Sequence, residues 1–291
     1  MTTSADRRFL AERARFARQM HLRAVRGNGG QYIQVRIPGD GPAAGPQPGT
    51  VLIWLPSSYT DPAQRRRTYP VIEAFHGMPG GPRDYRSPFG ASTLLGGGAA
   101  EHRIGDAIMV VPELAPEGVD TECMNGPGLT METWITRTIP DWVIDHLRVQ
   151  ASPASWASLG YSMGGWCAVM ATVLHPQRFG SAILLGAYYR PIFSSRWAPY
   201  TAADLPARYE LLSWLRTHHP KVNLWVEVSQ QDPLSGPESA QLVRTVKAPT
   251  SVTEVVLPYA GHRWEVWREV TPEALAWLGR TAAAFAPARV A

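Results

Sequence analysis

The sequence has few of the features that mark several classes of protein. It contains two cysteines among 291 residues, Cys123 and Cys167, too few for the disulfide framework of a small secreted domain. No Cys-x-x-Cys pair or Cys/His cluster has the spacing of a structural zinc site. No run approaches the ~18 apolar residues that cross a bilayer, and there is no internal repeat. These absences argue against a disulfide scaffold, a zinc module, a membrane-spanning protein and a repeat array.

Lysine is nearly absent as well, since Lys221 and Lys247 are the only two. The formal net charge of +4 is concentrated in residues 1–26, which hold seven arginines against Asp6 and Glu12. The rest of the chain is close to neutral, and the basic stretch lacks the interleaved aromatic residues that stack on bases. The charge pattern therefore predicts no binding of nucleic acid.

Residues 1–28 are predicted to form a basic helical segment. Phe9, Phe16 and Met20 recur at near-helical spacing, which fits a helix lying on the domain or making weak contact with a membrane surface. No apolar stretch of ~7–15 residues follows the arginines, so the chain as given is predicted to be soluble and to lack a cleavable secretion signal.

Short apolar runs predict the fold. We expect strands at 32–37, 51–55, 71–75, 108–111, 156–159, 182–185, 223–228 and 252–257. The fully apolar runs among them are typical of interior strands of a mostly parallel sheet with helices on both faces. Helices are expected at 166–174, at 272–285 and at 131–147, the last kinked or split at Pro140. The sequence thus predicts a single α/β domain over residues 29–291.

An aromatic-rich insertion at 187–220 precedes the strand at 223–228. An insertion at the carboxyl end of a strand lies where α/β sheets bind ligands. Its aromatic residues are therefore expected either to form a lid or an acyl pocket, with Tyr188 and Tyr189 binding substrate, or only to pack the insertion onto the sheet.

The clearest motif is Gly160-Tyr161-Ser162-Met163-Gly164, which matches G-x-S-x-G between a predicted strand and a predicted helix. This is the context of a nucleophile elbow, in which the serine Oγ is exposed above the sheet. A Cβ at either glycine is expected to collide with the neighbouring strand or helix. Ser162 is therefore the predicted nucleophile, and the Met163 N–H at the helix start is a predicted oxyanion donor.

A serine nucleophile needs a base, and elbow enzymes place their residues in the chain order serine, acid, histidine. His262 follows the last predicted strand and is the predicted base, whereas surface or packing roles are expected for His175, His218 and His219. Asp232 is the first carboxylate after the strand at 223–228 and is the predicted acid. Glu238 is the alternative, and Glu227, inside that strand, is less suited.

The second oxyanion donor is expected in His76-Gly77-Met78-Pro79-Gly80-Gly81, directly after the strand at 71–75. The glycines allow the backbone to approach a substrate, and Pro79 has no N–H. Met78 is therefore the predicted donor. For His76, we expect a packing or hydrogen-bonding role rather than a catalytic or metal-binding one.

Together these motifs resemble the antigen 85 mycolyltransferase and esterase D branch of the α/β-hydrolase superfamily, over roughly residues 30–285. Met131-Glu132-Thr133-Trp134 with Ile139-Pro140-Asp141-Trp142 is similar to the helix before the elbow. The stretch from Gly261 to Trp267 resembles the histidine loop, H-x-W-E-x-W. The resemblance implies an α/β-hydrolase fold, acyl-serine chemistry on esters, Trp264 lining the site, and a location in the cell envelope or outside the cell.

The sequence also departs from the mycolyltransferases. Gly81 occupies the place of an arginine that helps them hold trehalose, Asp232 follows the esterase D pattern, and their cysteine pair is reduced to Cys123 alone. These departures favour a general esterase over trehalose mycolylation.

The sequence therefore predicts a serine esterase that acts on small-molecule, lipid or sugar esters, with no metal or organic cofactor. Two alternatives remain. One is an acyltransferase of antigen 85 type that passes the acyl group to a sugar, alcohol or amine. The other is a non-catalytic binding protein with the same fold.

Overall fold

The computed structural model describes residues 30–39, 49–259 and 261–288. The predicted basic segment at residues 1–28 lies outside the described residues.

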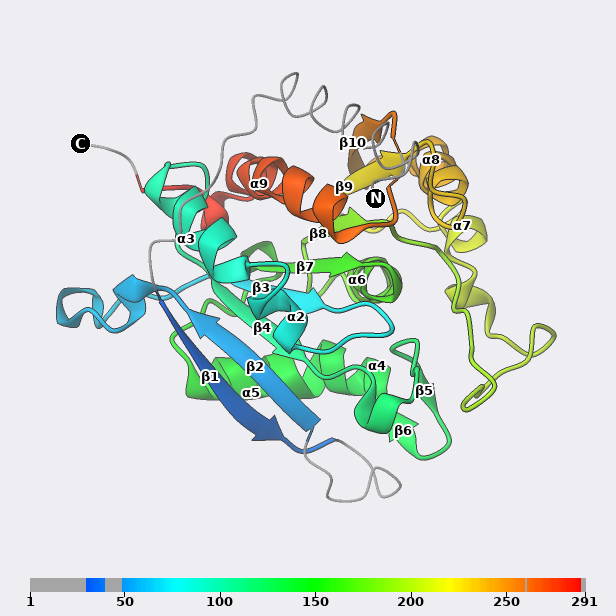
Figure 1. Ribbon diagram of the computed structural model, residues 1–291, viewed down its shortest axis with the longest axis horizontal. Coiled ribbons are helices and arrows are strands. Elements are labelled where there is room, and N and C mark those ends of the chain that lie inside the picture. Colours follow the sequence, from blue (N-terminus) through cyan, green and yellow to red (C-terminus); the bar gives the residue numbers. More distant parts are fainter. Residues whose placement is uncertain (1–29, 40–48, 260, 289–291) are drawn as a thin grey trace, which may run out of the picture.

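Eight strands form one sheet in the order β1-β2-β4-β3-β7-β8-β9-β10 (Figure 1). β1 pairs antiparallel with β2 and β2 antiparallel with β4, while all other neighbours are parallel. The strands are β1 Gln31–Ile37, β2 Gly49–Leu55, β3 Val71–Phe75, β4 Ile108–Pro112, β7 Trp156–Tyr161, β8 Ser181–Leu185, β9 Asn223–Ser229 and β10 Ser251–Leu257. A separate ribbon joins β5 Asn125–Gly126 to β6 Leu129–Thr130. The predicted mostly parallel sheet is confirmed.

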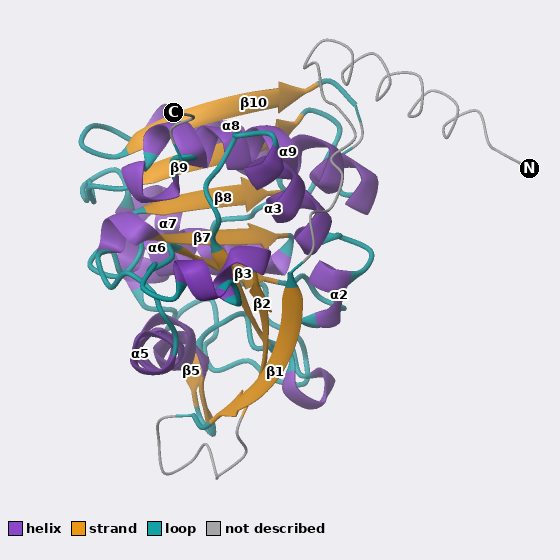
Figure 2. Cartoon of the chain, turned by 90° about the vertical axis from the view of Figure 1, so that its left-hand side faces the viewer, coloured by secondary structure: helices purple, strands orange, loops and turns teal. Residues whose placement is uncertain are grey.

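Helices cover both faces of the sheet (Figure 2). One face carries α4 Met131–Thr133, α5 Ile139–His146, α6 Met163–Leu174, α7 Leu211–Trp214 and α8 Gly236–Thr245. The other carries α2 Arg83–Arg86, α3 Ala91–Ala100 and α9 Trp264–Thr281. In β3, Val71 and Phe75 face the first layer, and Ile72 and Ala74 face the second. Because both faces of the interior strands are buried, their sequences are unbroken apolar runs.

The expected helices have different bounds in the structure. The helix expected at 166–174 begins earlier, at Met163. The helix expected at 131–147 consists of α4, a π-helical stretch Trp134–Thr138, and α5, with Pro140 in the first turn of α5. Thr138 and Ile139 have helical backbone angles, so the helix is continuous, and Pro140, which has no N–H, directly follows its π-helical stretch. The helix expected to begin at Pro272 begins at Trp264 instead. Before Pro272, α9 buries Val266 and Val270 against the sheet. This burial offsets the loss of the one backbone hydrogen bond that the proline cannot make.

Cys123 and Cys167 form a disulfide, so the prediction that Cys123 stands alone is wrong. Cys123 lies in the segment after β4 and Cys167 in α6, and both are fully buried. The two residues are 44 positions apart in the chain, and their Cα atoms are 5.7 Å apart in space. Only the packing of that segment on α6 brings the two cysteines together, which is why their spacing in the sequence did not reveal the pair.

Removing this disulfide should destabilise the fold. For a loop of this length, the entropy of closing the unfolded chain corresponds to about 4 kcal/mol, and measured values are typically ~2–4 kcal/mol. We therefore expect the double variant Cys123→Ala/Cys167→Ala to lose ~2–4 kcal/mol in its free energy of unfolding by urea. Adding a reductant should lower the free energy of unfolding of the native chain by a similar amount and leave that of the variant unchanged. Equal stability of the two proteins without reductant would contradict this expectation.

Candidate active site

Ser162 occupies a tight turn between β7 and α6. Its φ of 57° and ψ of −125° lie in a region that residues other than glycine rarely adopt. A Cβ added to Gly160 would lie 1.8 Å from the Gly164 carbonyl oxygen, and one added to Gly164 would lie 1.9 Å from that of Phe75. The prediction that neither glycine tolerates a side chain is confirmed. The turn holds Ser162 in a strained conformation at the N-terminus of α6.

Three polar side chains meet at this turn. Ser162 Oγ lies 3.0 Å from His262 Nε2, and Nδ1 of the same imidazole lies 2.8 Å from Asp232 Oδ2. The three residues follow β7, β9 and β10, parallel strands whose carboxyl ends lie at one edge of the sheet (Figure 1). The structure thus brings together the predicted nucleophile, base and acid.

The side chain of Asp232 is fully buried but well supplied with hydrogen bonds. Ser235 Oγ donates to Oδ2 at 2.5 Å, and the Leu234 N–H donates to Oδ1 at 2.9 Å. Burial by itself would raise the pKa of Asp232, but the hydrogen bonds from His262, Ser235 and Leu234 outweigh it and hold the pKa below its usual value. The carboxylate therefore stays ionised at neutral pH and accepts a hydrogen bond from the Nδ1–H of His262. That arrangement leaves Nε2 free to accept the proton of Ser162.

The alternative acid and two of the other histidines have different partners. Glu238 Oε2 accepts the backbone N–H of Tyr189 at 3.0 Å. His175 Nε2 lies 2.8 Å from Glu132 Oε1, and His218 Nδ1 lies 3.0 Å from the Trp214 carbonyl oxygen. These contacts agree with the packing roles expected for the two histidines.

The loop after β3 lies against the elbow. A Cβ added to Gly77 would lie 2.8 Å from the Tyr161 ring and 3.2 Å from the Cβ of Ser162. Within the described ranges, neither the Met78 nor the Met163 backbone N–H donates a hydrogen bond to the protein. Both amides are thus available to an oxygen atom of a ligand, as an oxyanion hole requires.

His76 anchors this loop. Its ring is fully buried, with Nδ1 2.9 Å from the Gly77 carbonyl oxygen and Nε2 accepting the Leu114 N–H at 2.9 Å. Because Nε2 accepts, Nδ1 carries the proton and donates to Gly77. His76 therefore ties the loop to the segment after β4, which is the hydrogen-bonding role that the sequence predicted.

Aromatic rings surround the histidine loop. Trp264 is partly exposed at the start of α9, and its ring centroid lies 4.4 Å from that of Tyr161, the residue before Ser162. Trp267 meets the His262 imidazole edge-on, at 5.1 Å between centroids and an interplanar angle of 84°. Trp264 is therefore placed beside the elbow, and Trp267 packs against the imidazole itself.

Tyr188 and Tyr189 are both buried. The Tyr188 hydroxyl donates to Glu122 Oε1 at 2.7 Å, and the Tyr189 hydroxyl lies 3.1 Å from Ser239 Oγ. Farther along the insertion, Phe193 packs on Trp197 and Tyr200 at ring distances of 6.3 and 6.4 Å. The aromatic residues of the insertion thus pack on one another and on the core.

The acid that Tyr188 contacts makes the stability of the fold sensitive to pH. Burial, reinforced by the nearby Asp120, raises the pKa of Glu122 to about 8 despite hydrogen bonds from Tyr188 and Ile192. Between the ordinary value of 4.5 and about 8, the folded chain binds a proton that the unfolded chain does not. This contribution to stability is therefore complete below pH 4.5 and is lost as the pH rises toward 8.

Glu122→Gln should remove this dependence. Urea unfolding at pH 6 and pH 8 should show the native chain losing up to ~1.4 kcal/mol per pH unit relative to the variant. Equal slopes for the two proteins would show that Glu122 is ionised in the folded state throughout this range.

Sequence reasoning missed two other side chains near the histidine. Ser235, three residues after Asp232, bonds that carboxylate, a spacing typical of local turns. Glu227 in β9 is buried and accepts the Gly186 N–H at 2.8 Å. The signal for Glu227 was a single acid inside an apolar strand, which we considered only as a candidate partner for His262.

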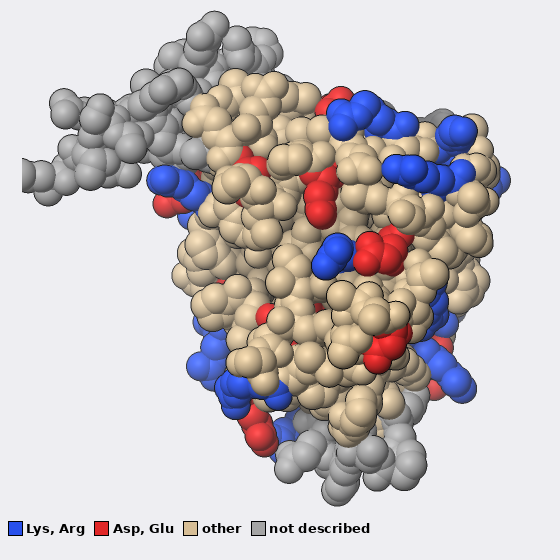
Figure 3. Space-filling view, turned by 90° about the vertical axis from the view of Figure 1, so that its right-hand side faces the viewer, with Lys and Arg blue, Asp and Glu red and all other residues tan. Residues whose placement is uncertain are grey.

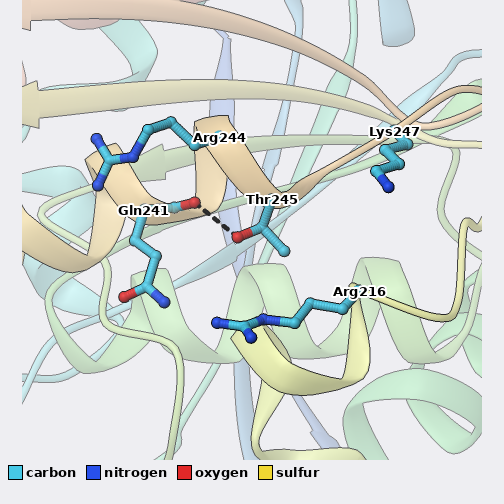
Figure 4. Close-up of a pocket in the computed structure, with 5 residues that line it drawn as sticks. All are labelled: Arg216, Gln241, Arg244, Thr245 and Lys247. Carbon is cyan, nitrogen blue, oxygen red and sulfur yellow. Dashed lines mark hydrogen bonds between the residues drawn. The ribbon is translucent and has the colours of Figure 1, made fainter.

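A basic pocket of about 470 Å³ lies apart from these residues. It is lined by Arg216, Gln241, Arg244, Thr245 and Lys247 (Figure 4). Arg244 and Lys247 lie in and just after the last turn of α8, where positive charge complements the helix dipole. On the face drawn in Figure 3, Lys and Arg side chains are interspersed with Asp and Glu. Arg244 and Lys247 therefore complement the negative end of the α8 dipole.

Within the ranges that the structure describes, no group of three or more His, Cys, Asp or Glu side chains could hold a metal ion. No helix in the same ranges is long and apolar enough to cross a membrane.

The model of the family described as "Putative esterase" matches residues 44–278. The chain belongs to this esterase family. The esterase is also 23% identical over 170 residues to Cgl0967/cg1104 of Corynebacterium glutamicum, a protein described as uncharacterized. That match covers 57% of this chain and only 39% of the relative, so the chain aligns with less than half of that protein.

Solved structures share the fold of the esterase. A ferulic acid esterase superposes with a TM-score of 0.70 at 18% identity, covering 86% of this chain and 98% of the other. The S-formylglutathione hydrolase of Agrobacterium tumefaciens gives 0.67 at 17% identity, covering 88% and 96%. FphF of Staphylococcus aureus, a fluorophosphonate-binding serine hydrolase, gives 0.66 at 15% identity, covering 86% and 98%. The predicted α/β-hydrolase fold and the resemblance to its esterases are confirmed, while the likeness to antigen 85 in particular stays a prediction.

Proposed function

We propose that this esterase hydrolyses carboxylic esters through an acyl-Ser162 intermediate. The observation that carries the proposal is the continuous hydrogen-bond chain from Ser162 through His262 to the ionised Asp232. In this chain, Ser162 is the nucleophile, His262 the general base and Asp232 the group that fixes the tautomer of the imidazole.

The reaction proceeds in two halves. Ser162 Oγ attacks the ester carbonyl carbon as its proton passes to His262 Nε2, and the Met78 and Met163 amides bind the resulting oxyanion. The bond to the alkoxy oxygen then breaks, and His262 protonates the departing alcohol. In the second half, a water molecule gives a proton to His262 as its oxygen attacks the acyl carbon. The bond from that carbon to Ser162 Oγ then breaks, and His262 returns the proton to Oγ, which releases the carboxylic acid and restores the Ser162 hydroxyl. Each oxyanion donor typically contributes ~10²–10³-fold to the rate of such a reaction.

The substrate is proposed to be a small-molecule, lipid or sugar ester whose apolar group contacts the Trp264 ring beside Tyr161. Tyr188 and Tyr189 are proposed to shape the substrate site from the insertion side, held by Glu122 and Ser239. Structural relatives named as a ferulic acid esterase and an enterobactin esterase support an ester as the substrate class.

Product analysis on a panel of p-nitrophenyl esters tests the proposal. We expect p-nitrophenol and free carboxylic acid in equal amounts, with the acid yield unchanged when sugars or alcohols are added. If most acyl groups are instead transferred to the added sugar or alcohol, the protein is an acyltransferase and not an esterase. Absence of turnover across the panel, down to the activated acetate, would favour a non-catalytic binding protein.

A further inference from the structure

Glu227 lies directly beneath the histidine loop, although it takes no part in the hydrogen-bond chain described above. It is the third residue from the end of β9, and its side chain shares with Trp225 the face that α9 covers. The residue is 1% exposed, and no cation of the described residues pairs with its carboxyl group. An ionised carboxylate in such a place would be costly, which favours the neutral acid.

One oxygen of Glu227 fixes the residue that lies against the imidazole. Oε2 accepts the N–H of Gly186, whose φ of +55° is in the left-handed region. A Cβ at Gly186 would lie 3.1 Å from the Trp267 ring and 3.3 Å from His262 Nδ1, the nitrogen that faces Asp232. The hydrogen bond therefore restrains a backbone segment in direct contact with the base.

The other oxygen lies under the residue before His262. A Cβ at Gly261 would lie 3.4 Å from Glu227 Oε1, and Oε1 itself has no hydrogen-bond partner among the described residues. One carboxyl group thus lies between the two segments that flank the imidazole: it is hydrogen-bonded to the segment after β8, and its other oxygen lies close beneath the histidine loop.

We infer that Glu227 is a positioning residue of the proposed esterase: it holds Gly186 against the imidazole, directly beneath the histidine loop, so that His262 stays aligned between Asp232 and Ser162. This inference rests on the proposed function.

The negative charge of Asp232 favours the neutral form of Glu227. Burial, followed by the charge of Asp232, raises the pKa of Glu227 to about 8, although the bond from Gly186 opposes the shift. The titratable groups that interact electrostatically with Glu227 are Asp232 and Tyr189. His262 and the uncharged Trp267 ring of α9 lie against Gly186, the residue that Glu227 holds. A second negative charge here would repel the Asp232 carboxylate that orients His262.

Two substitutions at Glu227 and one matched control test the inference with p-nitrophenyl acetate. Glu227→Gln keeps a neutral acceptor for Gly186, and we expect its kcat at pH 7 to stay within about threefold of the native value. Glu227→Leu removes the acceptor, and kcat should fall at least tenfold while KM changes less than twofold. Glu73→Gln is the control, because Glu73 is equally buried, in β3, and neither of its carboxyl oxygens has a hydrogen-bond partner among the described residues; its kcat should be unchanged.

The pH profile supplies the second readout. The kcat of the native chain should fall at least threefold between pH 8 and pH 9.5, and Glu227→Gln should abolish that fall. The inference is overturned if Glu227→Leu has the same kcat as the native chain. It is also overturned if the native chain and Glu227→Gln have identical pH profiles, and this second test remains even if Glu227→Leu fails to fold. If the proposed function itself is wrong, the native chain will be no more active than Ser162→Ala, which distinguishes the two failures.

Discussion

Ser162→Ala is expected to lower kcat for p-nitrophenyl acetate by about a million-fold. The remaining rate is what the oxyanion donors and substrate binding provide without a nucleophile. The substitution removes the only atom that forms the bond to the acyl carbon and leaves His262 without a proton to accept. Alanine keeps the Cβ that already occupies the strained turn, so we expect the melting temperature to change by no more than a few degrees.

Ser57→Ala is the matched control, because Ser57 is an exposed serine in a short 3₁₀ helix remote in sequence from the elbow. Its kcat should equal that of the native chain. If the alanine at position 162 supports native turnover, another residue is the nucleophile and the assignment fails.

Asp232→Asn should reduce kcat about 10⁴-fold. An asparagine can donate to His262 Nδ1 as well as accept from it, so it permits the tautomer in which Nε2 carries the proton and cannot act as a base. Steady-state kinetics at pH 7.5, with circular dichroism to confirm folding, measures the effect.

Glu238→Gln tests the alternative acid. Its carboxylate contacts the Tyr189 backbone, so the glutamine variant should keep kcat within about threefold of the native value. A large loss in Glu238→Gln together with a small one in Asp232→Asn would transfer the role of the acid to the helix after β9.

The features that sequence predicted best are those that a few neighbouring residues determine. The turn at Ser162 needs two glycines between a strand and a helix, and both glycines leave no room for a Cβ. The interior strands show themselves as apolar runs because both of their faces are covered. Asp232 and His262 were predicted from the chain order serine, acid, histidine of elbow enzymes, because each follows one of the last two predicted strands.

The features that sequence did not predict depend on contacts between distant segments. Cys123 and Cys167 pair only because the segment after β4 packs on α6. The start of α9 at Trp264 was missed because Pro272 is a strong signal to end a helix, whereas burial against the sheet is not visible in the sequence. In the sequence, Glu227 is only an acid inside a strand, and its hydrogen bond to Gly186 and its proximity to Gly261 exist only in the folded chain.

In the proposed mechanism, His262 and Asp232 make Ser162 nucleophilic. Reaction with a fluorophosphonate probe, followed by digestion and mass spectrometry of the peptides, tests it most directly. We expect a single phosphonyl group, on Ser162, whose rate of attachment falls by orders of magnitude in His262→Ala. Labelling of another residue, no labelling at all, or labelling of Ser162 at the same rate without His262 would contradict it.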